Sequence, residues 1–171
     1  MSAAEFSRSV AISRLPARPV ELVADEEERR KLAGRFGLPL IARFEAMLTL
    51  VAEGTTVDAT GRLSAWFSQN CAVAGEPFDT ALDVPLTLRF VPALAAIGEE
   101  EEHEFAPDDP DEIEYDGTTL DLGEAVAQSF GLALDPYATG PDADTARREA
   151  GLDGGGAGGA FAALASLKRK D

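Results

Sequence analysis

The chain of 171 residues carries 31 acidic and 15 basic side chains, a formal net charge of −16 at pH 7, and a single cysteine, Cys71. One cysteine excludes an internal disulfide framework and a metal site built from several thiolates of one chain. No apolar run approaches the roughly 20 residues of a membrane helix, and the N-terminus lacks the basic start and apolar block of a secretory signal, so we expect a cytoplasmic protein without a membrane partner.

The first third of the chain contains two candidate short strands and a helix. The strands fall at residues 6–12 and 20–23. Asp25 begins the helix, because its carboxylate can accept from free backbone N–H groups and Glu28 completes a capping box. Gly37 ends it. An apolar stripe at helical spacing is formed by Leu32, Ala33 and Phe36.

The clearest pattern is a period-two alternation of apolar and polar residues in three runs, 40–52, 57–67 and 82–90. Such alternation predicts three antiparallel strands with one buried face. Glu53-Gly54 suits a short hairpin loop between the first two runs. Pro85 falls on the polar side of the third run, which indicates an edge strand or a bulge.

Trp66 lies on the polar side of the second run, opposite the apolar Leu63, Ala65 and Phe67. Two interpretations are open for this indole. The favoured one is a second core layer beneath a helix, and the other is an exposed aromatic that binds a partner.

An acidic segment follows, and residues 98–112 are predicted to form a long loop because of their length and charge. One more short strand is expected at residues 113–115. A second helix begins at Asp121, where Glu124 again completes a capping box. Its buried stripe, spaced by four, consists of Leu122, Val126 and Phe130.

These elements predict an α+β fold in one domain, residues 1–138. The domain is built on a mainly antiparallel sheet of five or six strands, for which a barrel-like closure is one option, with two packed helices. The glycine-rich residues 139–159 read as a disordered linker. Residues 160–171 form a short amphipathic segment that either docks on its own domain or binds a partner.

The negative charge is confined to one third of the chain. Between Arg89 and Arg147 there are 16 acidic residues and no Lys or Arg, and the rest of the chain is neutral. Such a field attracts basic partners and repels phosphate, whereas the simpler alternative is a solvated loop that maintains solubility. The candidate partner-binding residues are Glu99, Glu100, Glu101, Glu102, Glu104, Asp108, Asp109, Asp111 and Glu112, and the candidate tail contacts are Phe161, Leu164, Leu167 and Lys168.

Residues for catalysis or metal binding are few. A dyad of Cys71 with His103, the only histidine, is conceivable, but nothing in the sequence lowers the thiol pKa, so a small residue at a strand end is the favoured reading. No nucleophile elbow or phosphate-binding loop is present. Residues 108–111 lack the spacing and glycine of an EF-hand. We therefore predict no enzymatic activity, no metal, no cofactor and no small-molecule substrate.

Direct RNA binding is the alternative to protein binding. Two small basic groups at the ends of the chain would carry it, but neither has the interleaved aromatic residues of a stacking platform. A third group, Arg29-Arg30-Lys31, is a weak candidate for RNA binding because three acids precede it. The basic residues of the two terminal groups are Arg8, Arg14, Arg18, Lys168, Arg169 and Lys170.

Residues 61–73 contain a Gly-x-Leu-x-Ala strand and a Gln-x-Cys turn, and a Pro-Phe pair follows within residues 76–78. In these motifs the sequence resembles the YceD family, the large ribosomal RNA subunit accumulation proteins. Residues 28–38 resemble its first helix, 113–137 its acidic segment and second helix, and 161–168 its C-terminal Phe-x-x-Leu-x-x-Leu-Lys tail. The resemblance is greatest to alphaproteobacterial members. The residues that carry the motifs are Gly61, Ala65, Gln69, Cys71, Pro77, Phe78, Asp121, Leu122, Gly123, Glu124 and Pro136.

The resemblance implies a role in the synthesis, processing or stability of large-subunit (23S) ribosomal RNA, and no known enzymatic activity. Many relatives carry further cysteines near Cys71, and their absence here argues against a metal. Gly159-Ala160 stand where the family usually has Asn-Pro before the tail. The leading hypothesis is a non-enzymatic ribosome biogenesis factor whose acidic surface binds a basic ribosomal protein or assembly factor, with ribosomal RNA as the alternative partner.

Overall fold

The structure, a computed structural model, describes residues 5–93 and 111–152. The chain divides into two compact units. The first contains residues 1–69 and 79–135, and the second contains residues 70–78 and those from 136 onward. Within the described residues, no helix is long and apolar enough to cross a membrane.

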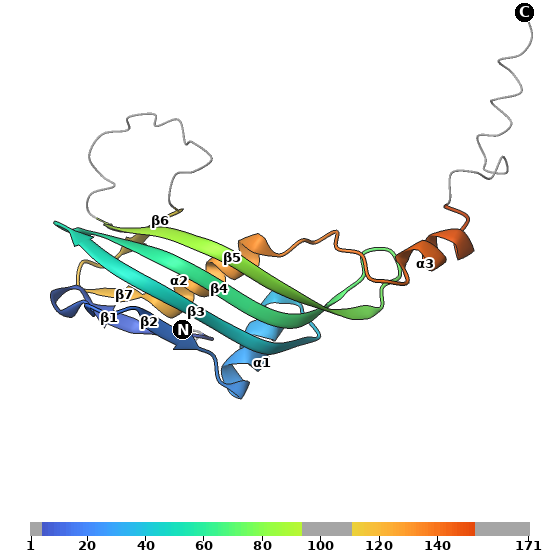
Figure 1. Ribbon diagram of the computed structural model, residues 1–171, viewed down its shortest axis with the longest axis horizontal. Helices are drawn as coiled ribbons and strands as arrows, with labels where there is room; N and C mark the ends of the chain where they lie inside the picture. Colours follow the sequence, from blue (N-terminus) through green and yellow to red (C-terminus); the bar gives the residue numbers. More distant parts are fainter. Residues whose placement is uncertain (1–4, 94–110, 153–171) are drawn as a thin grey trace, which may run out of the picture. The chain divides into compact units, whose positions relative to one another are not determined.

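The first unit is built on a five-stranded sheet in the order β2-β3-β4-β5-β6, together with a separate antiparallel pair, β1 and β7 (Figure 1). In the sheet, β3 is antiparallel to both β2 and β4, whereas β6 runs parallel to β5. The elements in chain order are β1 (Ser9–Ala11), a 3-10 helix (Ile12–Arg14), β2 (Val20–Val23), α1 (Glu26–Phe36), β3 (Leu40–Glu53), β4 (Thr56–Asn70), β5 (Pro77–Pro92), β6 (Asp111–Tyr115), β7 (Thr119–Asp121) and α2 (Leu122–Ala133).

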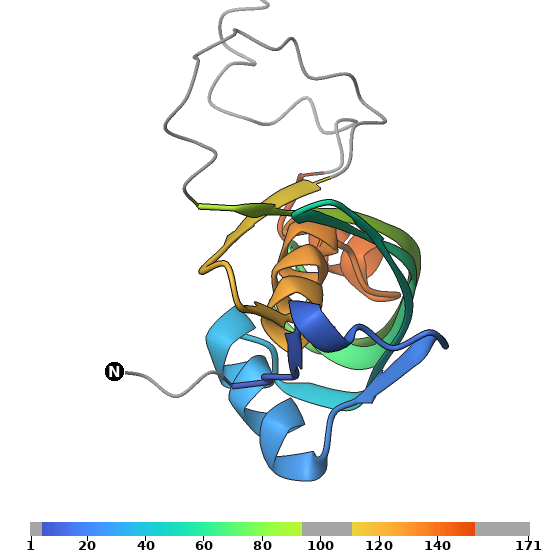
Figure 2. The ribbon, with the colours of Figure 1, turned by 90° about the vertical axis from the view of Figure 1, so that its left-hand side faces the viewer.

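The α+β class and the mainly antiparallel sheet are confirmed. β3 and β4 pair from Leu40 opposite Ser68 to Glu53 opposite Thr56, and the predicted alternation holds from Phe44 onward. It was wrong at the start of β3, because a register shift between Ile41 and Arg43 buries Ile41 and leaves Leu40 and Ala42 exposed. The option of a barrel was wrong: in the described part of the chain the sheet remains open, with β2 and β6 at its two edges. Figure 2 shows why, because the sheet curves around α2, and the helix occupies the space that a closed barrel would enclose.

The boundaries of two strands differ from the prediction. β5 begins at Pro77 and not at residue 82, and β6 begins at Asp111, so the end of the predicted loop 98–112 is strand. The alternation does continue through Phe78 and Thr80, whose side chains are half-buried. Thr80 is a polar residue on the inner face, and it concealed this part of the strand in the sequence pattern.

The capping of α1 is as predicted. The side chain of Asp25 accepts from the Glu28 amide at 2.9 Å, and the Glu28 carboxylate accepts from the Asp25 amide at 2.9 Å. Gly37 ends the helix with φ 65°, a left-handed conformation that glycine adopts without strain. The two hydrogen bonds of the capping box therefore define where α1 begins, and Gly37 defines where it ends before β3.

The core of the first unit is centred on the ring of Phe130 in α2, which is fully buried. Phe36, Phe44 and Phe67 each pack edge-to-face against it, with ring centroids 5.4, 5.2 and 5.3 Å away. These rings come from α1, β3 and β4. Edge-to-face pairs are favourable beyond the area they bury, so one residue of α2 joins the helix pair to the concave face of the sheet.

The second unit contains the loop between β4 and β5 and a third helix, α3 (Ala143–Glu149). This helix lies within residues 139–159, which the sequence predicts to be a linker, so that prediction was wrong for these residues. The glycines that suggested it begin only at Gly151, whereas Ala143–Glu149 contains good helix formers. The amide of Ala72 donates to the carbonyl of Ala138 at 2.9 Å, which joins the loop to the segment before α3.

Candidate functional site

The structure places only part of the predicted partner-binding set. Asp111 and Glu112 lie at the start of β6, and both are exposed. The tail contacts Phe161, Leu164, Leu167 and Lys168 lie outside the described residues. The same is true of the other acids of the set, namely Glu99, Glu100, Glu101, Glu102, Glu104, Asp108 and Asp109.

β6 presents a row of acidic side chains at one edge of the sheet. Asp111, Glu112 and Glu114 are exposed, while Ile113 is half-buried and Tyr115 is 7% exposed. The Tyr115 hydroxyl donates to the carbonyl of Thr55, which holds the strand against the β3–β4 hairpin. Within the described part of the chain, the three carboxylates have no ion pair or hydrogen bond. Sequence reasoning missed Glu114, which the alternation through residues 111–115 would have identified.

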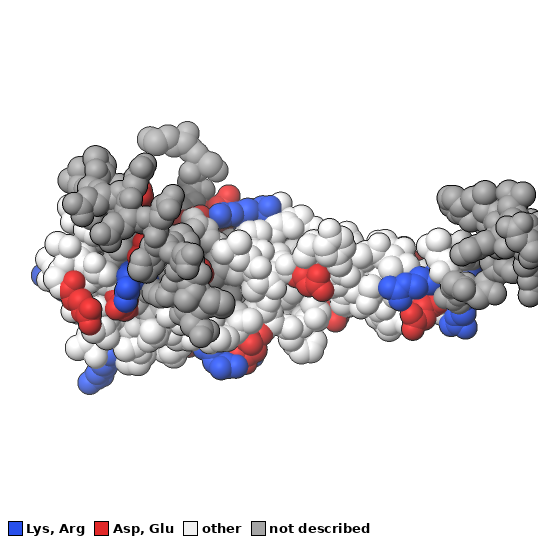
Figure 3. Space-filling view, turned by 90° about the horizontal axis from the view of Figure 1, so that it is seen from above, with Lys and Arg blue, Asp and Glu red and all other residues white. Residues whose placement is uncertain are grey.

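By contrast, most basic side chains of the first unit are neutralised by nearby acids. On the face seen in Figure 3, blue and red side chains lie next to one another in small groups. The pairs include Arg8–Glu28, Lys31–Glu27, Arg35–Glu124, Arg43–Glu45, Arg62–Asp83 and Arg89–Asp58. The acids on β6 form no such pair among the described residues, although Arg89, which is paired with Asp58, lies opposite Glu112.

Arg8, which the sequence places in the basic N-terminal group, is held inside the fold. Its guanidinium donates to both oxygens of Glu28, at 2.6 and 2.8 Å, and to the carbonyl of Val23 at 3.0 Å. The hydrogen bonds with Glu28 raise the pKa of Arg8 and lower the pKa of Glu28. Arg14 and Arg18 are exposed and have no ion pair among the described residues. The structure thus leaves two of the three N-terminal arginines available to a partner.

The Arg8–Glu28 pair predicts a pH dependence of stability. Because the pKa of Glu28 is lowered in the folded state, its contribution is fully present above the ordinary glutamate pKa, about 4.3. It is lost as the pH falls through the lower folded-state value. We expect the wild type to lose stability more steeply below about pH 4.3 than Glu28→Gln. Urea unfolding at several pH values measures this, with the exposed Glu21→Gln as control; equal slopes for all three proteins would contradict it.

Trp66 lies on the outer face of the sheet and is 53% exposed. Its neighbour across the strand pair is Arg43 of β3. The favoured interpretation, a second core layer beneath a helix, was therefore wrong, because α2 packs on the opposite, concave face (Figure 2). The indole is a second candidate contact surface, although the pairing of Arg43 with Glu45 leaves little net charge beside it.

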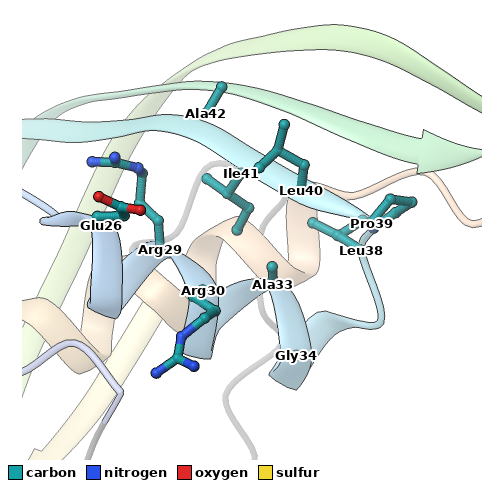
Figure 4. A pocket seen from close by; sticks show the side chains of 10 residues that line it. All are labelled: Glu26, Arg29, Arg30, Ala33, Gly34, Leu38, Pro39, Leu40, Ile41 and Ala42. Atoms are coloured by element: carbon teal, nitrogen blue, oxygen red, sulfur yellow. The ribbon is translucent and has the colours of Figure 1, made fainter.

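A hollow of about 460 Å³ lies between α1 and the beginning of β3 (Figure 4). Arg29 and Arg30 line it from α1, together with Glu26, and the strand contributes apolar residues such as Leu40. The Arg29 guanidinium donates to the carbonyl of Ala24 at 2.7 Å, which holds it at the start of the helix. With a carboxylate among its cations and a mainly apolar wall, this hollow does not have the chemistry of a phosphate site.

Cys71 begins a tight turn in the second unit and is 4% exposed. The amide of Ala74 donates to its Sγ at 3.3 Å. Amide donors, first that of Ala74 and then that of Gly140, lower the pKa of the thiol. The expectation that nothing lowers this pKa was wrong, because the donors are backbone groups that no side-chain pattern reveals. His103 lies outside the described residues, which contain no group of three or more His, Cys, Asp or Glu placed to hold a metal ion.

The remaining motif residues build the fold. Asp121 caps α2 by accepting from the Glu124 amide at 3.1 Å, and the same carboxylate accepts from the Arg8 amide at 2.9 Å. Glu124 is bound by both terminal nitrogens of Arg35 at 2.8 Å. A side chain at Gly123 would come within 2.6 Å of the carbonyl of Phe6. Ala65 and Leu122 are buried, Gln69 and Phe78 are half-buried, and Pro77 and Pro136 are exposed.

Comparison with known protein families gives one match. Residues 59–168 match the family described as "Large ribosomal RNA subunit accumulation protein YceD". The matched range contains most of β4, all of β5, β6, the acidic segment and α2, and most of the second unit. No match was found among curated proteins or among solved structures.

Proposed function

The chain belongs to the YceD family of large ribosomal RNA subunit accumulation proteins, and we propose that it supports the accumulation of this RNA by binding a basic protein through an acidic surface. The family name implies the role in ribosomal RNA accumulation. The acidic surface, the basic partner and a non-catalytic mode of action are the parts that we add.

The observation that carries the proposal is the excess of acidic side chains on β6. Asp111, Glu112 and Glu114 are exposed at a sheet edge and form no ion pair in the part of the chain that the structure describes, although Arg89 of β5 lies opposite Glu112. In the sequence, Asp108 and Asp109 precede this strand directly, and five further acids lie between Glu99 and Glu104. Charges of one sign gathered in this way raise the local concentration of a basic partner and accelerate its association.

Neutralising β6 is expected to weaken partner binding. In Asp111→Asn/Glu112→Gln/Glu114→Gln each carboxylate becomes an amide of the same shape, and we expect about tenfold weaker retention of basic proteins at low salt. The measurement is affinity capture from a cell lysate treated with ribonuclease, at two salt concentrations. A cellular readout is the ratio of large-subunit to small-subunit ribosomal RNA in a deletion strain that expresses each variant.

The control changes the net charge by the same amount at other places. Glu21, Glu76 and Glu149 are exposed and have no ion pair among the described residues, so Glu21→Gln/Glu76→Gln/Glu149→Gln is expected to behave as the wild type. Equal weakening in both variants would show that net charge alone matters, and no weakening in either would contradict the proposal.

Direct RNA binding is the second candidate function, supported by Arg14 and Arg18, which are exposed and form no ion pair with any described residue. It predicts that ribonuclease abolishes capture and that Arg14→Gln/Arg18→Gln reduces it, while the β6 variant retains it. The same capture experiment therefore separates the two functions.

A further inference from the structure

We propose that the open edge of β5 binds an extended, basic peptide segment as an additional strand of the sheet. This inference rests on the proposed function, since it specifies how a basic partner would engage the protein. β5 has 16 residues, but β6 pairs only with residues 88–92. In the described part of the chain, residues 79–87 therefore have a neighbouring strand on the β4 side alone.

The backbone groups of this edge have a defined direction. The amide of Ala93 donates to the carbonyl of Tyr115 at 3.0 Å, so its N–H points to the β6 side. Successive residues of a strand direct these groups to alternate sides, and Ala81, Asp83 and Thr87 therefore face the open edge. Pro85 shares this direction, which explains its presence in a long strand: its missing N–H removes no bond to β4.

A hollow of about 250 Å³, lined by polar and apolar groups in similar measure, lies beside this edge, between β5 and the end of α2. Val84 lines it from the strand and is only half-buried, and Leu132 lines it from the helix and is 80% exposed. A strand added to β5 would direct alternate side chains towards Val84 and Leu132. The site thus offers both components of strand addition, free backbone groups and a place for every second side chain.

The charge around the edge favours a basic occupant. Asp111 lines the hollow, no described Lys or Arg does so, and Asp79 and Asp83 are exposed along β5. Asp83 pairs with Arg62, whereas Asp79 accepts a hydrogen bond from the Ser68 hydroxyl and has no ion pair among the described residues. A second copy of β5, or the acidic segment of the chain itself, would bring like charges together, which is unfavourable across a strand pair. A basic segment meets the opposite charge.

The test uses the full chain and a labelled synthetic peptide of alternating Lys and Val as the probe. Fluorescence anisotropy measures its affinity, and amide hydrogen exchange locates it. We expect slowed exchange at Ala81, Asp83 and Thr87. Methylation of every second peptide nitrogen, on the edge that would pair with β5, should weaken binding about tenfold, because it removes the donors and blocks close approach of that edge.

The matched pair of variants is Leu132→Ser and Leu152→Ser. Both leucines are exposed, at 80% and 69%, but only Leu132 lines the hollow. Loss of an apolar contact predicts about fivefold weaker binding for Leu132→Ser. Leu152→Ser is expected to bind the peptide as tightly as the wild type. Both substitutions are on the surface and leave the core intact.

Three outcomes would overturn the inference. Protection of β6 alone, with no effect of Leu132→Ser, would place the peptide on the acidic row and leave the proposed function standing. Slow exchange of Ala81, Asp83 and Thr87 in the free chain would show that another segment or a second copy already occupies the edge. Failure of the Lys-Val peptide to bind would exclude strand addition by this class of segment, while capture from the lysate would still decide the proposed function.

Discussion

A Phe130→Ala variant is expected to lose about 3–5 kcal/mol of the free energy of unfolding. Phe130 is fully buried and contacts three aromatic rings at once, those of Phe36, Phe44 and Phe67. Truncation leaves a cavity at the point where α1, α2 and the sheet meet. Because small domains are stable by only about 5–15 kcal/mol, the loss is a large part of the total.

Urea unfolding followed by circular dichroism measures this effect. The control is Phe130→Leu, which keeps most of the buried volume and should lose clearly less than the alanine variant. A loss below about 1 kcal/mol for Phe130→Ala would contradict the central position of this ring.

The second large effect is expected for Gly61→Ala. Gly61 lies in β4 opposite Leu48 of β3, and a Cβ at this position would lie 1.8 Å from the carbonyl oxygen of Met47. That atom belongs to the backbone, so relief requires the two central strands to separate. Overpacking of this kind costs about 1–3 kcal/mol and occasionally more, and we expect the upper end of that range.

Gly34→Ala provides the matched control. Gly34 lies inside α1, and a Cβ there meets nothing within 4 Å. The same change in chemistry should therefore raise the free energy of unfolding by about 0.5–1 kcal/mol, because alanine is the better helix former. Urea unfolding is therefore expected to show a lower free energy of unfolding for Gly61→Ala and a higher one for Gly34→Ala. Equal changes in the two variants would contradict the close approach of the backbone at Gly61.

The elements that could be predicted from the sequence are those with local causes. The alternation in residues 40–67 depends on which face of one hairpin is buried, and the capping box of Asp25 and Glu28 lies within four residues. The capping box was confirmed, and so was the alternation except at residues 40–42, where a register shift reverses the two faces. The stripe that ends at Phe130 was also confirmed as the buried face of α2.

The features that escaped prediction depend on residues distant in the sequence. Trp66 is exposed because none of the described helices of the first unit packs on its side of the sheet, and Arg8 is bound to Glu28, twenty positions away. No period or motif within a short window contains such information. For the candidate site, composition identified the acidic segment, but the sheet edge that carries Asp111 and Glu112 followed only from the parallel pairing of β5 with β6.

The double role of Asp121 has a consequence for how the chain folds. Its carboxylate caps α2 and also accepts from the amide of Arg8, which lies 113 positions earlier, and among the described strands β1 pairs only with β7. A ribosome releases the chain from its N-terminus at about 5–20 residues per second. β1 therefore cannot pair with β7 until the ribosome has translated β7, and contacts of such sequence separation are slow to form. The N-terminal strand of the first unit thus reaches its native pairing only late in the synthesis of the chain.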